Sequence, residues 1–211
     1  MSIIATANSS NSFKPVPAGL HLARCYRIID LGNQKTEYMG AVKMQRKVML
    51  QFEVWSEDEN GEPTKTDKGE PMSISKNYSL TLADKATLRK DLQTWRGRDF
   101  TSEELRGFNL KNVLGVWAML SVTKSTGRDG KEYINIGAVM PVPPHVKKAG
   151  LPEAHNEPKM YSIDEHDEDL FQSFSDKLRA KIMASPEFQR KGISAQPAQS
   201  SPVDDDSDIP F

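Results

Sequence analysis

Apolar and polar residues alternate in several segments of the chain, most clearly at residues 47–55. Val48, Leu50, Phe52 and Val54 share one side of this segment, and mostly polar residues share the other. Neighbouring side chains of a β-strand point to opposite faces, so this period of two predicts a strand with one buried face. Weaker patterns predict four further strands, at residues 20–31, 74–82, 113–124 and 131–139. In the last two, the residues expected to face the core are Leu114, Val116, Ala118, Leu120, Val122, Ile134, Ile136 and Ala138.

Turn and helix signals connect these strands. Gly32 with Asn33 is expected to end the first strand, and Asp129 with Gly130 to turn the last hairpin. Residues 83–96 change to a helical period, with Leu88, Leu92 and Trp95 on one face. Three strands, a helix and two strands is the element order of the OB-fold, a small Greek-key barrel that binds oligonucleotides. We therefore expect a mainly β protein with a five-stranded OB-fold at residues 13–145.

The segments outside this domain differ in composition. Residues 1–12 are rich in Ser and Asn and predict a flexible arm, and residues 146–161 predict a polar linker. Residues 162–190 predict one amphipathic helix whose apolar stripe comprises Leu170, Phe174, Leu178 and Ile182. The stripe can dock on the barrel or on a second copy in a homodimer. Residues 191–211 predict a disordered acidic tail.

Charge is divided unevenly along the chain. Residues 1–150 hold 22 Lys and Arg against 16 Asp and Glu, a net charge of +6, and residues 151–211 carry a net charge of -7. A basic body suits a polyanionic partner such as nucleic acid. The acidic extension can compete for the same basic surface or recruit another protein.

Several classes of protein are disfavoured. Cys25 is the only cysteine, which excludes an intrachain disulfide, and no stretch approaches the ~20 apolar residues of a membrane span. With no signal-peptide pattern at residues 1–12, we expect a cytoplasmic protein without membrane association. The histidines lack metal-ligand spacing, and no phosphate loop or nucleophile motif appears, so we expect neither catalysis nor a cofactor or metal. A metal-dependent nuclease using Glu53, Asp129 and Lys131 remains an alternative.

Aromatic and basic residues lie on the strand faces opposite the predicted core. Trp55, Trp117 and Tyr133 fall on that parity. Exposed aromatic rings stack on unpaired bases while Lys and Arg hold phosphates, which is how single strands are bound without sequence preference. The candidate DNA-binding residues are Arg24, Tyr26, Lys47, Trp55, Lys76, Trp117, Lys124, Arg128, Lys131 and Tyr133.

The last residues combine acids with a short apolar cluster. Ile209-Pro210-Phe211 cannot bury enough surface to fold alone, but it can fill a pocket on another protein. The candidate protein-docking residues are Asp204, Asp205, Asp206, Asp208, Ile209, Pro210 and Phe211. With DNA absent, we expect these acids to visit the basic surface of the body, from which DNA would displace them.

This tip resembles the C-terminal tip of bacterial single-stranded DNA-binding proteins, although Ser207 interrupts the acidic run. The body, in stretches such as residues 13–19 and 130–136, resembles OB-fold single-stranded DNA-binding proteins encoded by phages. The resemblance implies binding and protection of single strands during phage replication or recombination in the host cytoplasm, with host or phage repair proteins recruited by the tail. It does not extend to the tetramer of the bacterial proteins. An adaptor or RNA-binding protein is the alternative.

Overall fold

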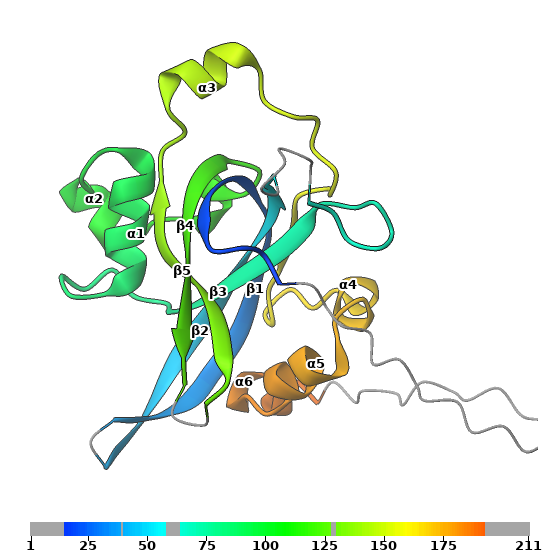
Figure 1. The fold of residues 1–211 in the computed structure, drawn as a ribbon. Helices are drawn as coiled ribbons and strands as arrows, with labels where there is room; N and C mark the ends of the chain where they lie inside the picture. Colours follow the sequence, from blue (N-terminus) through cyan, green and yellow to red (C-terminus); the bar gives the residue numbers. More distant parts are fainter. Residues whose placement is uncertain (1–14, 39, 58–63, 128–129, 193–211) are drawn as a thin grey trace, which may run out of the picture.

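The computed structural model describes residues 15–38, 40–57, 64–127 and 130–192 (Figure 1). It is mainly β, with a six-stranded sheet and several short helices. The strands are β1 (Gly19–Tyr38), β2 (Ala41–Trp55), β3 (Met72–Ser79), β4 (Trp117–Thr126), β5 (Glu132–Met140) and β6 (Lys159–Tyr161). The order β3-β2-β1-β4-β5 is antiparallel throughout, and β6 joins β1 in parallel.

Helical segments separate β3 from β4, as the sequence predicts. They are α1 (Thr87–Arg96), α2 (Ser102–Arg106) and the 3-10 helix η1 (Leu110–Val113). Thr101 and Glu104 form a capping box at the start of α2. Three strands, helices and two strands follow one another in the expected order. No hydrogen-bonded ladder joins β3 to β5 among the described residues, so the sheet is open.

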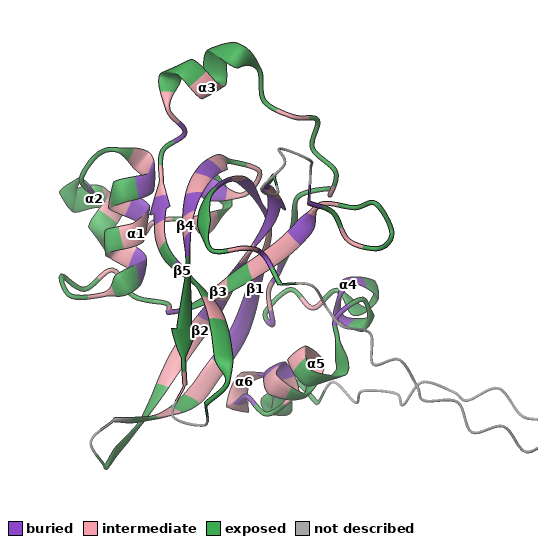
Figure 2. Cartoon of the chain, viewed as in Figure 1, coloured by how far each residue is buried: buried purple, intermediate pink, exposed green. Residues whose placement is uncertain are grey.

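The main core lies between the inner face of the sheet and α1 (Figure 2). All four inward residues predicted for β2 are buried, and α1 adds Leu88, Leu92 and Trp95. The rings of Phe52 and Trp95 are 5.7 Å apart, and the Trp95 indole N–H donates to the Trp117 carbonyl oxygen. The alternation at residues 47–55 was therefore a correct guide to burial.

Two predictions of inward residues need correction. Val116 is 41% exposed, because η1 and the turn at Gly115 occupy residues that the sequence assigned to the start of a strand. In β5, Ala138 is half-buried and Val139 is buried instead. A register shift against β4 inserts one residue between Ile136 and Ala138, and this reverses the alternation.

The prediction that Gly32 and Asn33 end the first strand is wrong. β1 continues to Tyr38, with a register shift against β2 between Asp30 and Gly32. Gly32 has φ +67°, a conformation that L side chains rarely adopt. A glycine at this position therefore forms a bulge within the strand rather than ending it.

The single C-terminal helix predicted from the sequence is also wrong. Three short helices take its place, α4 (Glu168–Gln172), α5 (Asp176–Met183) and α6 (Pro186–Arg190). The stripe residues nevertheless pack inward, with Leu170, Phe174 and Ile182 buried in a second core cluster that includes Ile29 and Leu31 of β1. The stripe therefore packs on the chain's own sheet, which removes the sequence-based reason for a homodimer.

The predicted linker, residues 146–161, contains most of α3 (Pro144–Ala149) and all of β6. The predicted arm, residues 1–12, lies outside the described residues, as does nearly all of the tail, including residues 193–211. Among the described residues no helix is long and apolar enough to span a membrane.

Candidate nucleic-acid interface

A buried ion pair holds the segment between α3 and β6 against the outer face of the sheet, the face opposite the main core. Glu53 is fully buried, and one carboxylate oxygen accepts from Arg24 Nη1 at 3.1 Å. The other accepts from the backbone N–H of Asn156 at 2.8 Å and from its Nδ2 at 2.6 Å. Arg24 also donates to the carbonyl oxygens of Gly115 and Asn156. We call residues 150–158 the strap.

This arrangement corrects two predicted DNA-binding residues. The Arg24 guanidinium is committed to Glu53 and to two carbonyl groups, so it is not available to a phosphate. Tyr26 is buried, and that burial raises the pKa of its hydroxyl. The sequence left the buried face of the first strand undecided, and the structure places Arg24 against Asn156 of the strap.

Trp55 and Trp117 are both half-buried on this outer face. Their ring centroids lie 4.8 Å apart with the planes inclined at 48°, so each ring covers part of the other. Trp55 also lines a cleft of about 450 Å³ with Leu20, Leu22 and Pro152. Both rings thus lie on the face opposite the core, as their parity predicted, and Trp55 lines a cleft.

Lys76 points away from the outer face and is held by α1. Its ammonium group lies 2.7 Å from the Asp91 carboxylate, which also accepts from the Tyr78 hydroxyl at 2.8 Å. Both members of the ion pair are mostly buried. Burial and the adjacent Asp91 charge raise the pKa of Tyr78. Lys76 therefore joins β3 to α1 and is not positioned for DNA.

Three predicted residues lie on the exposed β4–β5 hairpin. Tyr133 is 47% exposed, Lys131 is exposed, and Lys124 pairs with Glu132 at 2.6 Å. Arg128 lies outside the described residues. None of these hairpin residues lines the Trp55 cleft.

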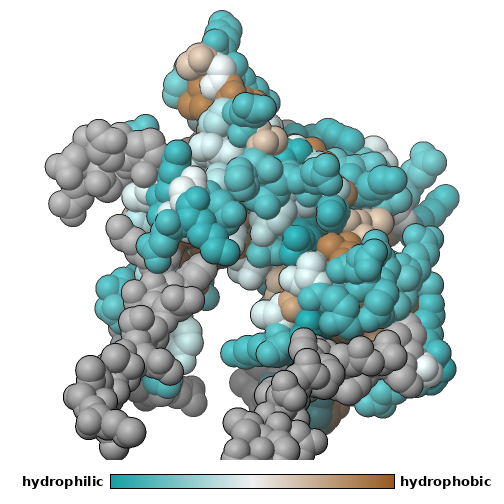
Figure 3. Space-filling view, turned by 90° about the vertical axis from the view of Figure 1, so that its right-hand side faces the viewer, coloured by the Kyte–Doolittle hydropathy of each residue, from teal (hydrophilic) through white to brown (hydrophobic). Residues whose placement is uncertain are grey.

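Lys47 belongs to a group of lysines that the sequence-based selection otherwise missed. On β2, Lys43 and Lys47 share one face, and the Lys47 ammonium donates to Gln45 Oε1 at 3.2 Å and Ser79 Oγ at 2.7 Å. α5 adds Lys177 and Lys181, which are one helical turn apart. We call Lys43, Lys47, Lys177 and Lys181 the lysine patch. Figure 3 shows the side of the molecule on which α4–α6 lie, and it is largely hydrophilic.

Like charges act on one another within the lysine patch. Burial lowers the pKa of the Lys181 ammonium, and the charges of Lys47 and Lys177 lower it further. Among the described residues, none of the four lysines forms an ion pair with a carboxylate. Cations that form no ion pair with a carboxylate attract phosphate groups, which relieve their mutual repulsion. The i, i+4 spacing of Lys177 and Lys181 was visible in the sequence, but their closeness to Lys47 depends on the packing of α5 on β1.

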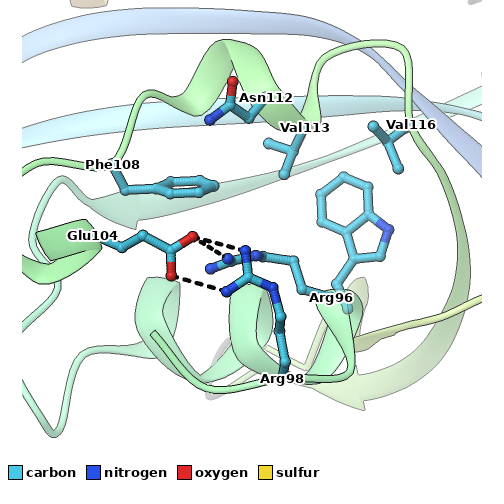
Figure 4. A pocket seen from close by; sticks show the side chains of 8 residues that line it. Arg96, Arg98, Glu104, Phe108, Asn112, Val113 and Val116 are labelled. Atoms are coloured by element: carbon cyan, nitrogen blue, oxygen red, sulfur yellow. Dashed lines mark hydrogen bonds and ion pairs between the residues drawn. The ribbon is translucent and has the colours of Figure 1, made fainter. Parts of the chain in front are cut away.

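A second group of cations, beside α2, shares one carboxylate and is partly neutralised by it (Figure 4). Arg96 and Arg98 both pair with Glu104, and the Arg96 guanidinium lies over the rings of Phe100 and Phe108, 4.6 and 4.8 Å from their centroids. Hydrogen bonding from Arg98 is the largest influence that lowers the pKa of Glu104 to about 2. The adjoining pocket has a volume of about 260 Å³. We interpret this group as a structural junction between α1 and α2.

The residues considered for nuclease chemistry do not form a site in the described part of the chain. Glu53 is saturated by Arg24 and Asn156, and Asp129 lies outside the described residues. Within the described ranges, no three His, Cys, Asp or Glu side chains are grouped so that they could hold a metal ion. His166 lies between the Tyr161 hydroxyl and the Glu168 carboxylate, at 2.8 and 2.7 Å, and packs on aromatic rings of the second core.

The sequence matches no protein-family model and no curated protein.

Proposed function

We propose that this protein binds single-stranded DNA without sequence preference, as a phage-encoded protein would during replication or recombination in the host cytoplasm. The observation that carries the proposal is the lysine patch: Lys47 of β2 lies near Lys177 and Lys181 of α5, and Lys43 continues the same face of β2. None of the four forms an ion pair with a described carboxylate. Lysine contacts to phosphates carry no base identity. Binding through the lysine patch is therefore expected to be independent of sequence.

The fold supports this proposal. The element order is that of an OB-fold, and Ile74 of β3 and Ile134 of β5 pack against the same core cluster. We infer that side chains rather than a hydrogen-bonded ladder bring β3 and β5 together into a partly open barrel. The lysine patch and the β4–β5 hairpin are then parts of a barrel surface that can present single strands.

Trp55 supports the preference for single strands. Its ring lines the cleft beside the strap, where it can stack on an unpaired base, whereas duplex bases already stack on their neighbours. Trp55 lies eight positions after Lys47 on β2, which corresponds to about 26 Å at a rise of ~3.3 Å per residue. A single strand a few nucleotides long can span that distance.

The proposal is tested by fluorescence anisotropy with labelled single-stranded DNA, duplex DNA and RNA at one fixed salt concentration. We expect single-stranded DNA to bind most tightly, with no preference among mixed sequences. If each lysine of the patch contacts one phosphate, the logarithm of affinity falls with the logarithm of salt at a slope of about -2.8, at ~0.7 per contact. Equal or tighter binding of duplex DNA contradicts the proposal, and tighter binding of RNA favours the alternative of an RNA-binding protein.

A matched pair of variants locates the site. Lys47→Gln with Lys181→Gln removes two charges from the lysine patch and is expected to reduce the salt slope by about 1.4. Lys147→Gln with Lys148→Gln removes the same net charge from the exposed helix α3 and is expected to leave the slope unchanged. Equal effects of the two variants would show that only net charge matters and that the lysine patch is not the site.

We further propose that residues 204–211 recruit replication, recombination or repair proteins of the host or phage. The support is the sequence, which joins acids to the apolar Ile209-Pro210-Phe211. Capture of such proteins by the full chain, and its loss in the Phe211→Ala variant, is the expected result. If Phe211→Ala captures the same proteins as the unchanged chain, the apolar tip is not the docking element.

A further inference from the structure

The hairpin that joins β1 to β2 extends beyond the rest of the sheet (Figure 1). β3 pairs with β2 only as far as Lys47, β4 pairs with β1 only at Gly19–Arg24, and β6 only at Arg27–Ile29. Residues 35–38 and 41–44 therefore form a two-stranded ribbon without a neighbouring strand among the described residues. We call them the ribbon. A two-stranded hairpin is only marginally stable in water, so it gains from contact with another surface.

The two faces of the ribbon differ. Lys35 is opposite Met44, and Glu37 is opposite Val42, and these four residues share one face because directly paired residues lie on the same side. We call them the ribbon face. The opposite face carries the pair Thr36 and Lys43, and Lys43 is part of the lysine patch. The ribbon thus separates a face suited to phosphates from a face with apolar groups.

The ribbon face is exposed and carries both signs of charge. Val42 and Met44 are each 53% exposed, although both are apolar. Lys35 and Glu37 are also exposed, and neither forms an ion pair in the described part of the structure. Apolar side chains with a polar rim can contact another protein, and the two charges here can pair with charges of that protein.

The arrangement of these four residues is self-complementary. Two ribbons can pack face to face about a two-fold axis that lies between them and runs parallel to the Thr36–Lys43 pair. The strands of the two copies then run in opposite directions. Lys35 of each copy then lies across from Glu37 of the other, and Met44 lies across from Val42. Both charges are paired and both apolar side chains are covered. A nucleic acid, by contrast, leaves Glu37 facing phosphates.

We propose that the ribbon face is the interface of a symmetric dimer with a second copy of this chain. Four side chains from each copy bury much less than the roughly 1,200–2,000 Å² of a standard stable interface, so the dimer is weak. Because Lys43 points away from the interface, each subunit keeps its lysine patch accessible. This surface differs from the apolar stripe of residues 170–182, which the chain's own sheet covers.

The test is sedimentation velocity of the full chain from about 5 to about 500 µM, a range that brackets weak association. We expect dimer to accumulate with concentration. Lys35→Glu places two acids opposite each other at both symmetry-related contacts, and Glu37→Lys places two lysines there. Each substitution is expected to raise the dimer Kd by about tenfold or more. The double variant Lys35→Glu with Glu37→Lys restores opposite charges and is expected to recover dimerisation.

Recovery by the double variant distinguishes an interface from damage to the fold or a change in net charge. Lys43→Gln, on the other face of the ribbon, is the matched control and should leave the dimer Kd unchanged. A chain that stays monomeric at the highest concentration overturns the proposal. So does a dimer that both single variants leave intact, or a double variant weaker than either single variant. Single-stranded DNA binding is measured in parallel, and a loss of DNA affinity in Val42→Ser without any dimer in the unchanged chain assigns this face to nucleic acid instead.

Discussion

Replacement of Glu53 by Ala tests the role of the strap contact most directly. The variant leaves the Arg24 guanidinium, only 10% exposed, without its anion. It also removes the acceptor of two hydrogen bonds from Asn156. Breaking one partner of a buried ion pair costs about 3–5 kcal/mol, because the remaining charge stays desolvated. Native domains are stable by only about 5–15 kcal/mol, so the variant is expected to lose a large share of its stability.

The free energy of unfolding is measured by urea denaturation followed by circular dichroism, with linear extrapolation to water. Glu57→Ala is the matched control, since this exposed acid lies just after β2 and should change stability by no more than about 0.5 kcal/mol. The double variant Arg24→Met with Glu53→Leu removes both charges and should be less destabilised than Glu53→Ala. A cost below about 1 kcal/mol for Glu53→Ala, or a double variant that is less stable than the single one, would refute the reasoning.

Three further predictions concern the bulge, the α2 junction and the tail. Gly32→Ala should destabilise the fold by about 2–5 kcal/mol in urea denaturation, because the strain of a left-handed backbone adds to overpacking. The new Cβ would lie 2.5 Å from the Cβ of Ser185. Gly40 has a similar φ and open space around it, so Gly40→Ala should show only the strain of about 1–2 kcal/mol. The lowered pKa of Glu104 contributes stability above pH 4.5 that is lost as the pH falls toward about 2, so Glu104→Gln should flatten the decline of Tm over that interval, and an unchanged decline contradicts this. Deleting residues 204–211 removes acids that compete with DNA for the basic surface, so it should strengthen single-stranded DNA binding at low salt and abolish capture of partner proteins. If neither property changes, the tail is only a solubilising extension.

The sequence by itself determined the order of the first five strands, the helical region between the third and fourth, and much of the main core. Residues 47–55 alternate with a period of two, and α1 has a helical stripe, so burial on these elements follows from local geometry. The capping box at Thr101 and Glu104 likewise depends on residues only three positions apart. Periodicity was reliable wherever one regular element packed on one core.

Irregular backbone was not readable in the same way. The bulge at Gly32 looks like a strand end in the sequence, because both need a glycine that tolerates positive φ. The register shift beside Ile136 likewise reversed the inward side of β5 without any change in composition. The stripe from Leu170 to Ile182 predicted burial correctly, although the backbone turns between α4 and α5 rather than running as one helix.

Tertiary structure alone decided which polar residues are available for binding. Arg24 and Lys76 are ordinary basic residues in the sequence. In the folded chain, Arg24 binds Glu53 and Asn156, and Lys76 binds Asp91. Lys181 gained its place in the lysine patch because α5 packs along β1 and brings it near Lys47, more than a hundred residues away in the chain. The burial pattern of a strand repeats every two residues and that of a helix every three to four, so both can be predicted from neighbouring residues. The pairing or exposure of a charge depends instead on segments that only the folded chain brings together.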